Sequence, residues 1–347
     1  MPEPNANSQT RLKVGVIGVG ALGQHHARLY AELSRTHEIE FVGVFDSNVE
    51  TAKSITSQHG GQPFDSIEIL TGKCDALSIV TPTSTHFAIA QQLLAQDKHL
   101  LVEKPMTDQA EEATQLVKLA HDRDLVLQVG HVERFNPVFS FLEKTAAHPR
   151  FIETHRLSPY PKRSTDIGVV LDLMIHDLDI VLAFVKSPVK SVDAVGIPVL
   201  SKSEDIANAR LRFENGCVAN VTVSRVSPEK MRKIRVFSGG DKPSYISLDY
   251  QAQEGFAYQL AAAEAQESSL LKKLFSAKDS AIVSEFGGKK IVREPVPIEK
   301  DEPLKLELRH FVECVQERRT PLVSGATAKQ ALDLAFEITA QIRTQDA

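Results

Sequence analysis

The feature that most constrains the fold of this chain is a glycine-rich turn between an apolar strand and a helix. The segment LKVGVIG at residues 12–18 is predicted to form a buried strand, and a helical pattern follows over residues 21–34. Gly18, Gly20 and Gly23 have the spacing Gly-x-Gly-x-x-Gly. Such glycines permit a tight turn and let the backbone approach a pyrophosphate at the positively polarised start of the helix. The arrangement predicts a dinucleotide-binding unit.

An acidic residue, Asp46, ends the second predicted strand at residues 39–46. Its carboxylate can accept hydrogen bonds from the adenosine ribose and would repel a 2′-phosphate, which favours NAD over NADP. The alternative is that Asp46 only caps the strand end and that the glycines only form a tight turn. The cofactor-binding residues predicted in this region are Gly18, Val19, Gly20, Ala21, Leu22, Gly23, Asp46 and Ser47.

The remainder of the chain divides into two regions of different pattern. Strand and helix patterns alternate up to residue 130, which indicates a doubly wound parallel sheet with helices on both faces. Later segments alternate with period two, and Asn215-Gly216 is a hairpin signal, as is typical of an antiparallel sheet. The sequence therefore predicts an α/β protein. Its expected parts are a disordered tail (1–11), a Rossmann domain (12–134), and a substrate-binding and oligomerisation domain with C-terminal helices (135–347).

The composition argues against several classes of protein. The net charge is -5 and no Lys or Arg cluster is present, so nucleic acid is a poor partner. No apolar run approaches the roughly 18 residues of a membrane helix, and the start of the chain lacks the apolar region of a secretory signal. Cys74, Cys217 and Cys314 are scattered, so neither a disulfide framework nor a thiolate zinc site is expected. We expect a cytoplasmic location.

Polar residues follow several of the predicted strands of the first region. Ligands of an open α/β sheet bind outside the carboxyl ends of its strands, so these residues are candidates for contact with the cofactor. Lys104, directly before Pro105, is a candidate to polarise a substrate oxygen, and the alternative is a solvated loop lysine. The predicted cofactor contacts from the strand ends are Thr81, Pro82, Thr83, His86, Glu103, Lys104 and His131.

The segment GVVLDLMIHDLDIVLAF at residues 168–184 is mostly apolar, yet it contains Asp172, His176, Asp177 and Asp179. With about 100° of rotation per helical residue, Asp172 and His176 point nearly the same way. Asp179 lies on the same stripe, whereas Asp177 points elsewhere. Burial of an unpaired charge is costly, so these groups need partners. Three interpretations remain open: an internally satisfied pair, a metal site that includes Asp179, or a general base His176 assisted by Asp172.

Three motifs together resemble one family. They are the glycine-rich turn, the triplet Glu103-Lys104-Pro105, and Asp172-x-x-x-His176 within DLMIHDLD. In this order they are similar to the motifs of the glucose–fructose oxidoreductase, inositol dehydrogenase and MocA (Gfo/Idh/MocA) family. The segment PLVSGATAKQALDLA at residues 321–335 also resembles that family's closing segment. The likeness covers nearly the whole chain.

The resemblance implies a Rossmann domain followed by an α/β domain with a large open, mainly antiparallel sheet. That sheet would make the interface of a homodimer or homotetramer. The resemblance also implies that Lys104, Asp172 and His176 form the catalytic set beside the nicotinamide of NAD, without a metal ion.

Two further segments, GHVERFNPVF and RLSPYPKRSTDIGVVLDLMIHDLD, resemble a branch of the family that oxidises the 3-hydroxyl of UDP-N-acetylglucosamine. In that branch an aminotransferase converts the resulting ketone to an amine used for lipid A-type glycolipids. Arginines in these segments would suit a diphosphate, although any one of them could be plain surface charge. The predicted substrate-binding residues are Lys104, Arg134, Asn136, Arg156, Arg163, Asp172 and His176. Another nucleotide sugar, or a free polyol such as inositol, is the alternative substrate.

These residues predict an NAD-dependent dehydrogenase. His176 would remove the proton from a secondary hydroxyl as hydride passes to the nicotinamide, while Lys104 donates a hydrogen bond to the same oxygen. Which of the two is the formal base is left open. A hypothesis of another class is an NAD-binding sensor without catalysis. The presence of both Lys104 and His176 argues against a sensor, which has no need of groups that transfer protons.

Overall fold

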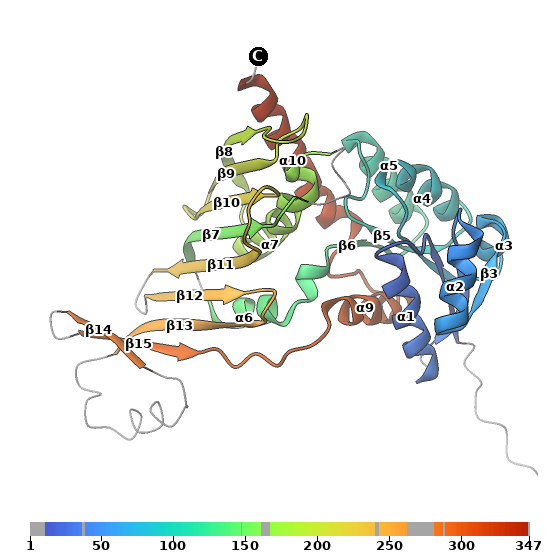
Figure 1. Ribbon diagram of the computed structural model, residues 1–347, viewed down its shortest axis with the longest axis horizontal. Helices are drawn as coiled ribbons and strands as arrows, with labels where there is room; N and C mark the ends of the chain where they lie inside the picture. Colours follow the sequence, from blue (N-terminus) through green and yellow to red (C-terminus); the bar gives the residue numbers. More distant parts are fainter. Residues whose placement is uncertain are drawn as a thin grey trace, which may run out of the picture. The chain divides into compact units, whose positions relative to one another are not determined.

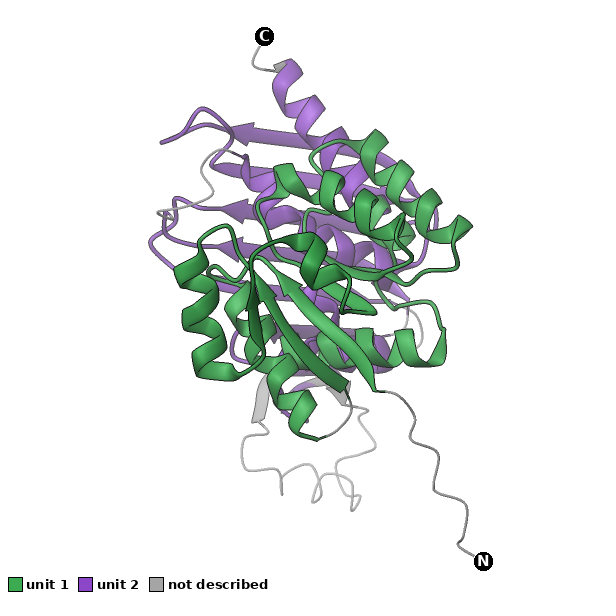
Figure 2. Ribbon diagram, turned by 90° about the vertical axis from the view of Figure 1, so that its right-hand side faces the viewer, with its two compact units in different colours: residues 1–131, 304–329 green, residues 132–303, 330–347 purple. Residues whose placement is uncertain are grey.

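The computed structural model describes residues 11–36, 39–146, 148–160, 167–239, 243–261, 281–286 and 289–345 (Figure 1). The chain forms two compact units, which Figure 2 colours separately. Unit 1 comprises residues 1–131 and 304–329, and unit 2 comprises residues 132–303 and 330–347. The sequence predicts a domain boundary after residue 134, whereas the two compact units divide after residue 131. Among the described residues, no helix is both long enough and apolar enough to cross a membrane.

Unit 1 is built on a six-stranded parallel sheet. Its strands are β1 (Leu12–Ile17), β2 (Ile39–Phe45), β3 (Gln62–Phe64), β4 (Ala76–Ile79), β5 (His99–Glu103) and β6 (Leu127–Gly130). They lie in the order β3-β2-β1-β4-β5-β6, and every neighbouring pair is parallel. This is the order of a doubly wound dinucleotide-binding fold, in which ligands bind where the order reverses, between β1 and β4. The predicted Rossmann sheet is confirmed.

The helices of unit 1 cover a sheet that is apolar on both faces. They are α1 (Gly23–Arg35), α2 (Val49–His59), α3 (Ile67–Thr71), α4 (His86–Leu94) and α5 (Ala110–Asp122), together with the short 3₁₀ turn η1 (Thr83–Thr85). Val14, Val16 and Ile17 of β1 are all 0% exposed. Strands of a parallel sheet are covered on both sides, which explains why the strand is a continuous apolar run.

One helix from the end of the chain also belongs to unit 1. It is α9 (Pro303–Glu317), and its Leu308, Phe311 and Val312 share a buried core with residues of β1, β2 and α1. From the sequence, this helix is expected in the second domain, residues 135–347. An amphipathic helix requires an apolar surface, and its own pattern does not specify which surface covers it.

Unit 2 is built on a nine-stranded sheet. Its strands are β7 (Pro149–Leu157), β8 (Val189–Ile197), β9 (Ile206–Phe213), β10 (Val218–Ser224), β11 (Met231–Ser238), β12 (Ser244–Asp249), β13 (Glu254–Ala261), β14 (Ala281–Phe286) and β15 (Lys289–Pro295). The order is β14-β15-β13-β12-β11-β7-β10-β9-β8, and among these strands only the pair β7–β10 is parallel. The predicted large, mainly antiparallel sheet is confirmed. The Asn215-Gly216 hairpin joins β9 to β10, and Gly216 has a φ of 83°.

The remaining elements of unit 2 are mostly helical. They are η2 (Val132–Phe135), α6 (Pro137–Thr145), a π-helical turn η3 (Val170–Met174), α7 (Ile175–Val185), and most of α10 (Gly325–Gln345). The π turn replaces the continuous α-helix that was assumed for residues 168–184. A π turn has i→i+5 hydrogen bonds, and such turns often occur at functional sites.

The outer face of the unit 2 sheet carries a row of aromatic rings. Phe151 of β7, Phe237 of β11, Tyr245 of β12 and Tyr258 of β13 are cross-strand neighbours, with successive ring centroids 5.7, 4.6 and 4.8 Å apart. All four are half-buried. Residues that alternate with them, such as Ile152, Val236 and Ile246, are buried on the opposite face.

Candidate active site

The glycine turn follows β1 at the point where the strand order reverses. Gly18 has a φ of 85°, a left-handed conformation that favours glycine. A Cβ added to Gly23 would lie 1.9 Å from the Gly18 carbonyl oxygen, so the close approach of α1 to the turn requires glycine at position 23. Gly20 differs, because a Cβ added there would meet no protein atom within 4 Å. The fold therefore has no steric need for glycine at position 20, and a ligand close to the backbone would explain it.

The first turn of α1 lies beside this open backbone. Its N-cap residue, Leu22, makes no side-chain capping hydrogen bond, and no acidic residue occurs in the first turn. The first amides of a helix need acceptors and form a positively polarised end. The pyrophosphate of a dinucleotide suits this end of α1, so the residues present fit NAD.

Asp46 directly follows β2 and contacts the glycine turn. The Val19 N–H donates to Asp46 Oδ2 at 2.8 Å, and the Asn48 N–H donates to Oδ1 at 2.9 Å. The carboxylate therefore caps the turn, as the alternative interpretation expected. Each oxygen retains capacity for a second hydrogen bond, so contact with a ribose is compatible with the cap.

His86 connects the ends of β4 and β5. Its ring is 1% exposed, with Nδ1 3.0 Å from the Pro105 carbonyl oxygen and Nε2 2.9 Å from the Thr81 carbonyl oxygen. Which ring nitrogen donates depends on the tautomer, and each nitrogen lies within hydrogen-bond distance of its carbonyl oxygen. His86 thus braces the loops that carry Thr81 and Lys104. Its direct contact with a cofactor stays a prediction.

Glu103 links Lys104 to the helix that starts at the glycine turn. Its Oε1 lies 3.1 Å from Nε2 of His26 in α1, and its Oε2 accepts the Lys104 N–H at 3.2 Å. His26 is 0% exposed and Glu103 is 6% exposed. His26 was not among the predicted site residues, although it lies only three residues after Gly23 within the helix predicted over residues 21–34.

The predicted cofactor-binding residues differ in their solvent exposure. Lys104 is half-buried. The exposed residues are Gly20, Ala21, Leu22, Ser47 and Pro82; Asp46, Thr81 and Thr83 are half-buried; and Gly18, Val19, Gly23, His86, Glu103 and His131 are buried.

In unit 2, the polar residues of the apolar segment fall into two classes. Asp172, on the π turn, and His176, in the first turn of α7, are half-buried. Asp177 and Asp179 are each 3% exposed. Only Asp172 and His176 therefore retain the solvent access that a substrate would need.

Two arginines neutralise the buried acids. Arg134 Nη1 donates to Asp179 Oδ1 at 3.2 Å. Arg156 donates to both oxygens of Asp177, through Nε at 2.8 Å and Nη2 at 3.2 Å, and through Nη1 to Glu133 at 3.1 Å. Burial alone lowers the pKa of Arg156, but the carboxylates of Asp177 and Glu133 more than reverse this and hold its pKa above the usual range. The guanidinium thus stays charged inside unit 2.

This network accounts for three predicted substrate-binding residues. Arg134, Arg156 and Asn136 are 7%, 4% and 2% exposed, respectively. Asn136 Nδ2 donates to Glu133 Oε2 and to the Tyr250 carbonyl oxygen, both at 3.1 Å, and its Oδ1 caps α6. The geometry gives all three a structural role, and their contact with a substrate stays a prediction. The remaining predicted arginine, Arg163, lies outside the described residues.

One of the three ligands predicted for a metal site in residues 168–184 is already paired with an arginine. This ligand, Asp179, is an ion-pair partner of Arg134. Within the part of the chain that the structure describes, no three His, Cys, Asp or Glu side chains are grouped to hold a metal ion. Asp172 and His176, which are both half-buried, carry side chains of the types that transfer protons in enzymes.

Two family models match the chain. The first, described as an oxidoreductase family with an NAD-binding Rossmann fold, matches residues 12–131. The second, the GFO/IDH/MocA C-terminal domain, matches residues 143–242. The predicted family and the predicted cofactor, NAD, are confirmed.

Full-length relatives give the same result. A UDP-N-acetylglucosamine 3-dehydrogenase from Acidithiobacillus ferrooxidans is 34% identical over 328 residues, which cover 94% of this chain and 96% of the relative. A solved structure of UDP-N-acetylglucosamine 3-dehydrogenase from that organism has a TM-score of 0.82 and 33% identity, covering 96% of this chain and 98% of the other. A scyllo-inositol 2-dehydrogenase (NAD(+)) from Bacillus subtilis is 25% identical over 351 residues, 96% of this chain and 94% of the relative. The predicted likeness to the UDP-N-acetylglucosamine branch is confirmed.

The two glycines of the turn should respond differently to alanine. Gly20→Ala should leave stability within about 0.5 kcal/mol, because its new methyl group meets no protein atom, but weaken NAD binding at least about tenfold. Gly23→Ala should destabilise unit 1 by about 1–3 kcal/mol, because its methyl group collides with Gly18. Calorimetric titration with NAD and urea unfolding measure the two effects. Unchanged NAD affinity in Gly20→Ala would remove the ligand explanation for this glycine.

The buried ion pair of unit 2 should be structural. Asp179→Ala leaves the guanidinium of Arg134 buried without its carboxylate, which should cost about 3–5 kcal/mol in urea unfolding. Adding Arg134→Met to that variant should restore part of the loss. Glu50→Ala, which removes the exposed ion pair with Lys53, is the control and should change stability little. Equal stability of Asp179→Ala and wild type would contradict this role.

Proposed function

This chain belongs to the GFO/IDH/MocA oxidoreductase family, and we propose that it oxidises the 3-hydroxyl of UDP-N-acetylglucosamine to a ketone. The chain is an NAD-binding dehydrogenase by its family, and the proposal concerns its substrate. The main support is the full-length similarity to the UDP-N-acetylglucosamine 3-dehydrogenase of Acidithiobacillus ferrooxidans. The similarity to inositol dehydrogenases favours a free polyol as the second candidate.

The residues proposed to hold NAD are those of unit 1. The open backbone at Gly20 and the start of α1, which has no side-chain cap, suit the pyrophosphate, and Asp46 suits the adenosine ribose. NAD, when bound, supplies the acceptor for the hydride. The carboxylate of Asp46 disfavours a 2′-phosphate, so the proposed cofactor is NAD rather than NADP.

Three side chains are proposed to act on the substrate hydroxyl. His176 accepts its proton, and Lys104 donates a hydrogen bond that stabilises the negative charge developing on the oxygen. Asp172 orients either the imidazole or the substrate by a hydrogen bond. Glu103 supports this arrangement from within unit 1, since it holds the backbone N–H of Lys104.

The substrate is tested by mixing the purified protein with NAD and a panel of UDP-N-acetylglucosamine, other nucleotide sugars and inositol. A reagent that traps ketones is included, because oxidation of an alcohol by NAD can be unfavourable at equilibrium. We expect nicotinamide reduction with UDP-N-acetylglucosamine and a product ketone at carbon 3, assigned by NMR. Turnover with inositol alone would favour the second candidate. Tight NAD binding without turnover across the panel would favour a sensor.

Variants of the proposed catalytic residues separate chemistry from cofactor binding. Lys104→Ala should lower kcat by at least about a hundredfold while the NAD dissociation constant stays near normal. His176→Ala should show a similar loss, with partial recovery at high pH if the imidazole is the base. Initial rates across pH and calorimetric titration with NAD give both quantities. Undiminished turnover of Lys104→Ala would exclude this residue from the mechanism.

We also propose that the outer face of the unit 2 sheet forms a homodimer or homotetramer interface. The strand register places the exposed pair Ile197 and Ile206 on the same face as the aromatic row. Polar pairs such as Asn208–Thr222 and Arg210–Asn220 lie on the strands between them. Exposed apolar side chains and aromatic rings surrounded by polar residues are typical of an interaction site.

The interface is tested by Ile197→Lys, which puts a charge on a side chain that is 54% exposed. We expect light scattering to give a smaller mass for this variant than for wild type. Leu322→Lys, at another exposed apolar residue but in unit 1, is the control and should keep the wild-type mass. A monomeric wild-type protein would contradict the proposal.

Two further proposals concern the cellular setting. We place the protein in the cytoplasm, in keeping with three buried cysteines that form no disulfide. The ketone product is the substrate class of an aminotransferase, which we propose as the next enzyme.

A further inference from the structure

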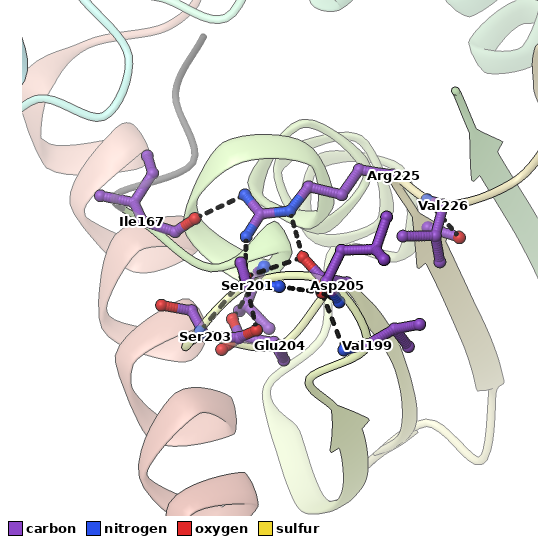
Figure 3. Close-up of polar contacts among 11 residues, drawn as sticks. Ile167, Val199, Ser201, Ser203, Glu204, Asp205, Arg225 and Val226 are labelled. Atoms are coloured by element: carbon purple, nitrogen blue, oxygen red, sulfur yellow. Dashed lines mark hydrogen bonds and ion pairs between the residues drawn. The ribbon is translucent and has the colours of Figure 1, made fainter. Parts of the chain in front are cut away.

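A fully buried arginine ties together three segments of unit 2. Arg225 directly follows β10 and is 0% exposed. Its guanidinium donates from Nε to Asp205 Oδ1 at 2.7 Å, from Nη1 to the Ile167 carbonyl oxygen at 2.7 Å, and from Nη2 to Ser201 Oγ at 2.8 Å (Figure 3). One side chain therefore connects the end of β10 to the loop between β8 and β9, and to the chain just before the π turn.

Asp205 is the anchor of this cluster. Its Oδ2 accepts the backbone N–H groups of Val199, Leu200 and Ser201 at 2.8, 2.5 and 2.9 Å. Burial raises the pKa of this carboxyl, but the Leu200 N–H and the Arg225 guanidinium outweigh burial and hold the pKa well below its usual range. The carboxylate is thus ionised at any working pH, and the loop that it binds is fixed.

The neighbouring residue, Glu204, holds the chain that leads into the π turn. Its carbonyl oxygen accepts the Val169 N–H at 3.1 Å, and its Oε1 accepts the Val170 N–H at 3.3 Å. A Cβ added to Gly168 would lie 1.8 Å from Glu204 Oε1, so the side chain lies directly against the backbone. The carboxylate occupies the start of a helical segment, where N–H groups need acceptors and negative charge is favourable.

The residues held in this way directly precede Asp172 and His176. The Asp172 N–H donates to the Gly168 carbonyl oxygen at 3.1 Å, so the position of Gly168 sets that of Asp172. The π turn then leads into α7, whose first turn carries His176. A shift of residues 167–170 would therefore move both side chains.

We propose that Glu204 and Arg225 are positioning residues for the reaction, because they fix residues 167–170 and thereby the placement of Asp172 and His176. This inference rests on the proposed function, in which those two side chains act on the substrate hydroxyl. Neither Glu204 nor Arg225 is assigned any contact with the substrate or with NAD.

The main test compares Glu204→Ala with Glu204→Gln. The alanine variant loses the acceptor for the Val170 N–H and should lower kcat about 10- to 100-fold, the loss expected when reacting groups are misplaced by about 1 Å. Its NAD dissociation constant should stay at the wild-type value, because the proposed NAD residues lie in unit 1. Glutamine keeps a carbonyl oxygen at the same position, so Glu204→Gln should recover most of the activity.

Two measurements separate positioning from general loss of stability. Val236→Ala removes buried methyl groups from β11, in the same unit, and serves as the stability control, with its unfolding temperature measured beside that of Glu204→Ala. Hydrogen exchange of the amides of residues 168–176 reports their order without any substrate. In Glu204→Ala these amides should exchange faster, while those of unit 1 should stay at wild-type rates. Arg225→Lys, which cannot reach three acceptors at once, should show the same pattern.

Each outcome decides the inference. Wild-type kcat in Glu204→Ala would overturn it, as would an equal loss of kcat in a Val236→Ala variant of equal stability. If the wild-type protein turns over no substrate of the panel, the proposed function fails. In that case hydrogen exchange still tests the positioning role of Glu204. Unchanged exchange rates of the amides of residues 168–176 in Glu204→Ala would overturn it. Should Arg225→Lys fail to fold, the Glu204 pair of variants decides alone.

Discussion

The contact between Gly23 and the Gly18 carbonyl is the constraint on which unit 1 depends. It lets α1 begin directly against the turn after β1. In the same helix, His26 lies 3.1 Å from Glu103 at the end of β5, and Glu103 accepts the backbone N–H of Lys104. One helix therefore connects the glycine turn, where the pyrophosphate is proposed to bind, to the surroundings of the proposed catalytic lysine.

In unit 2, solvent access separates structural charges from those available for chemistry. Asp177 and Asp179 are buried opposite Arg156 and Arg134, because a carboxylate removed from water requires a cation or several donors. Asp172 is half-buried and lies on a π turn whose entry is fixed by Glu204. A short apolar segment thus holds three carboxylates in two different environments, two buried beside arginines and one half-buried.

Local patterns predicted much of this architecture. The strand, glycine turn and helix of unit 1, the Asn215-Gly216 hairpin, and the mainly antiparallel sheet all depend on spacings of a few residues. The rotation assumed along residues 168–184 failed at the π turn, since the i→i+5 turn changes the rotation per residue and no residue there signals it. The assumed rotation nevertheless predicted that Asp172 and His176 share one side of the segment and that Asp177 does not. In the structure Asp172 and His176 are half-buried, whereas Asp177 is buried.

The sequence by itself determined the fold class, the dinucleotide turn and the family, because each of these depends on residues close together in the chain or on motifs in a fixed order. Only the tertiary structure decided which distant groups meet. It placed α9 in the core of unit 1, paired Arg156 with Asp177, and brought Arg225 to Ile167 and Asp205. Ion pairs and buried helices depend on surfaces that come together only on folding. The local sequence around a charged residue or an amphipathic helix does not specify which distant residue or surface it will contact.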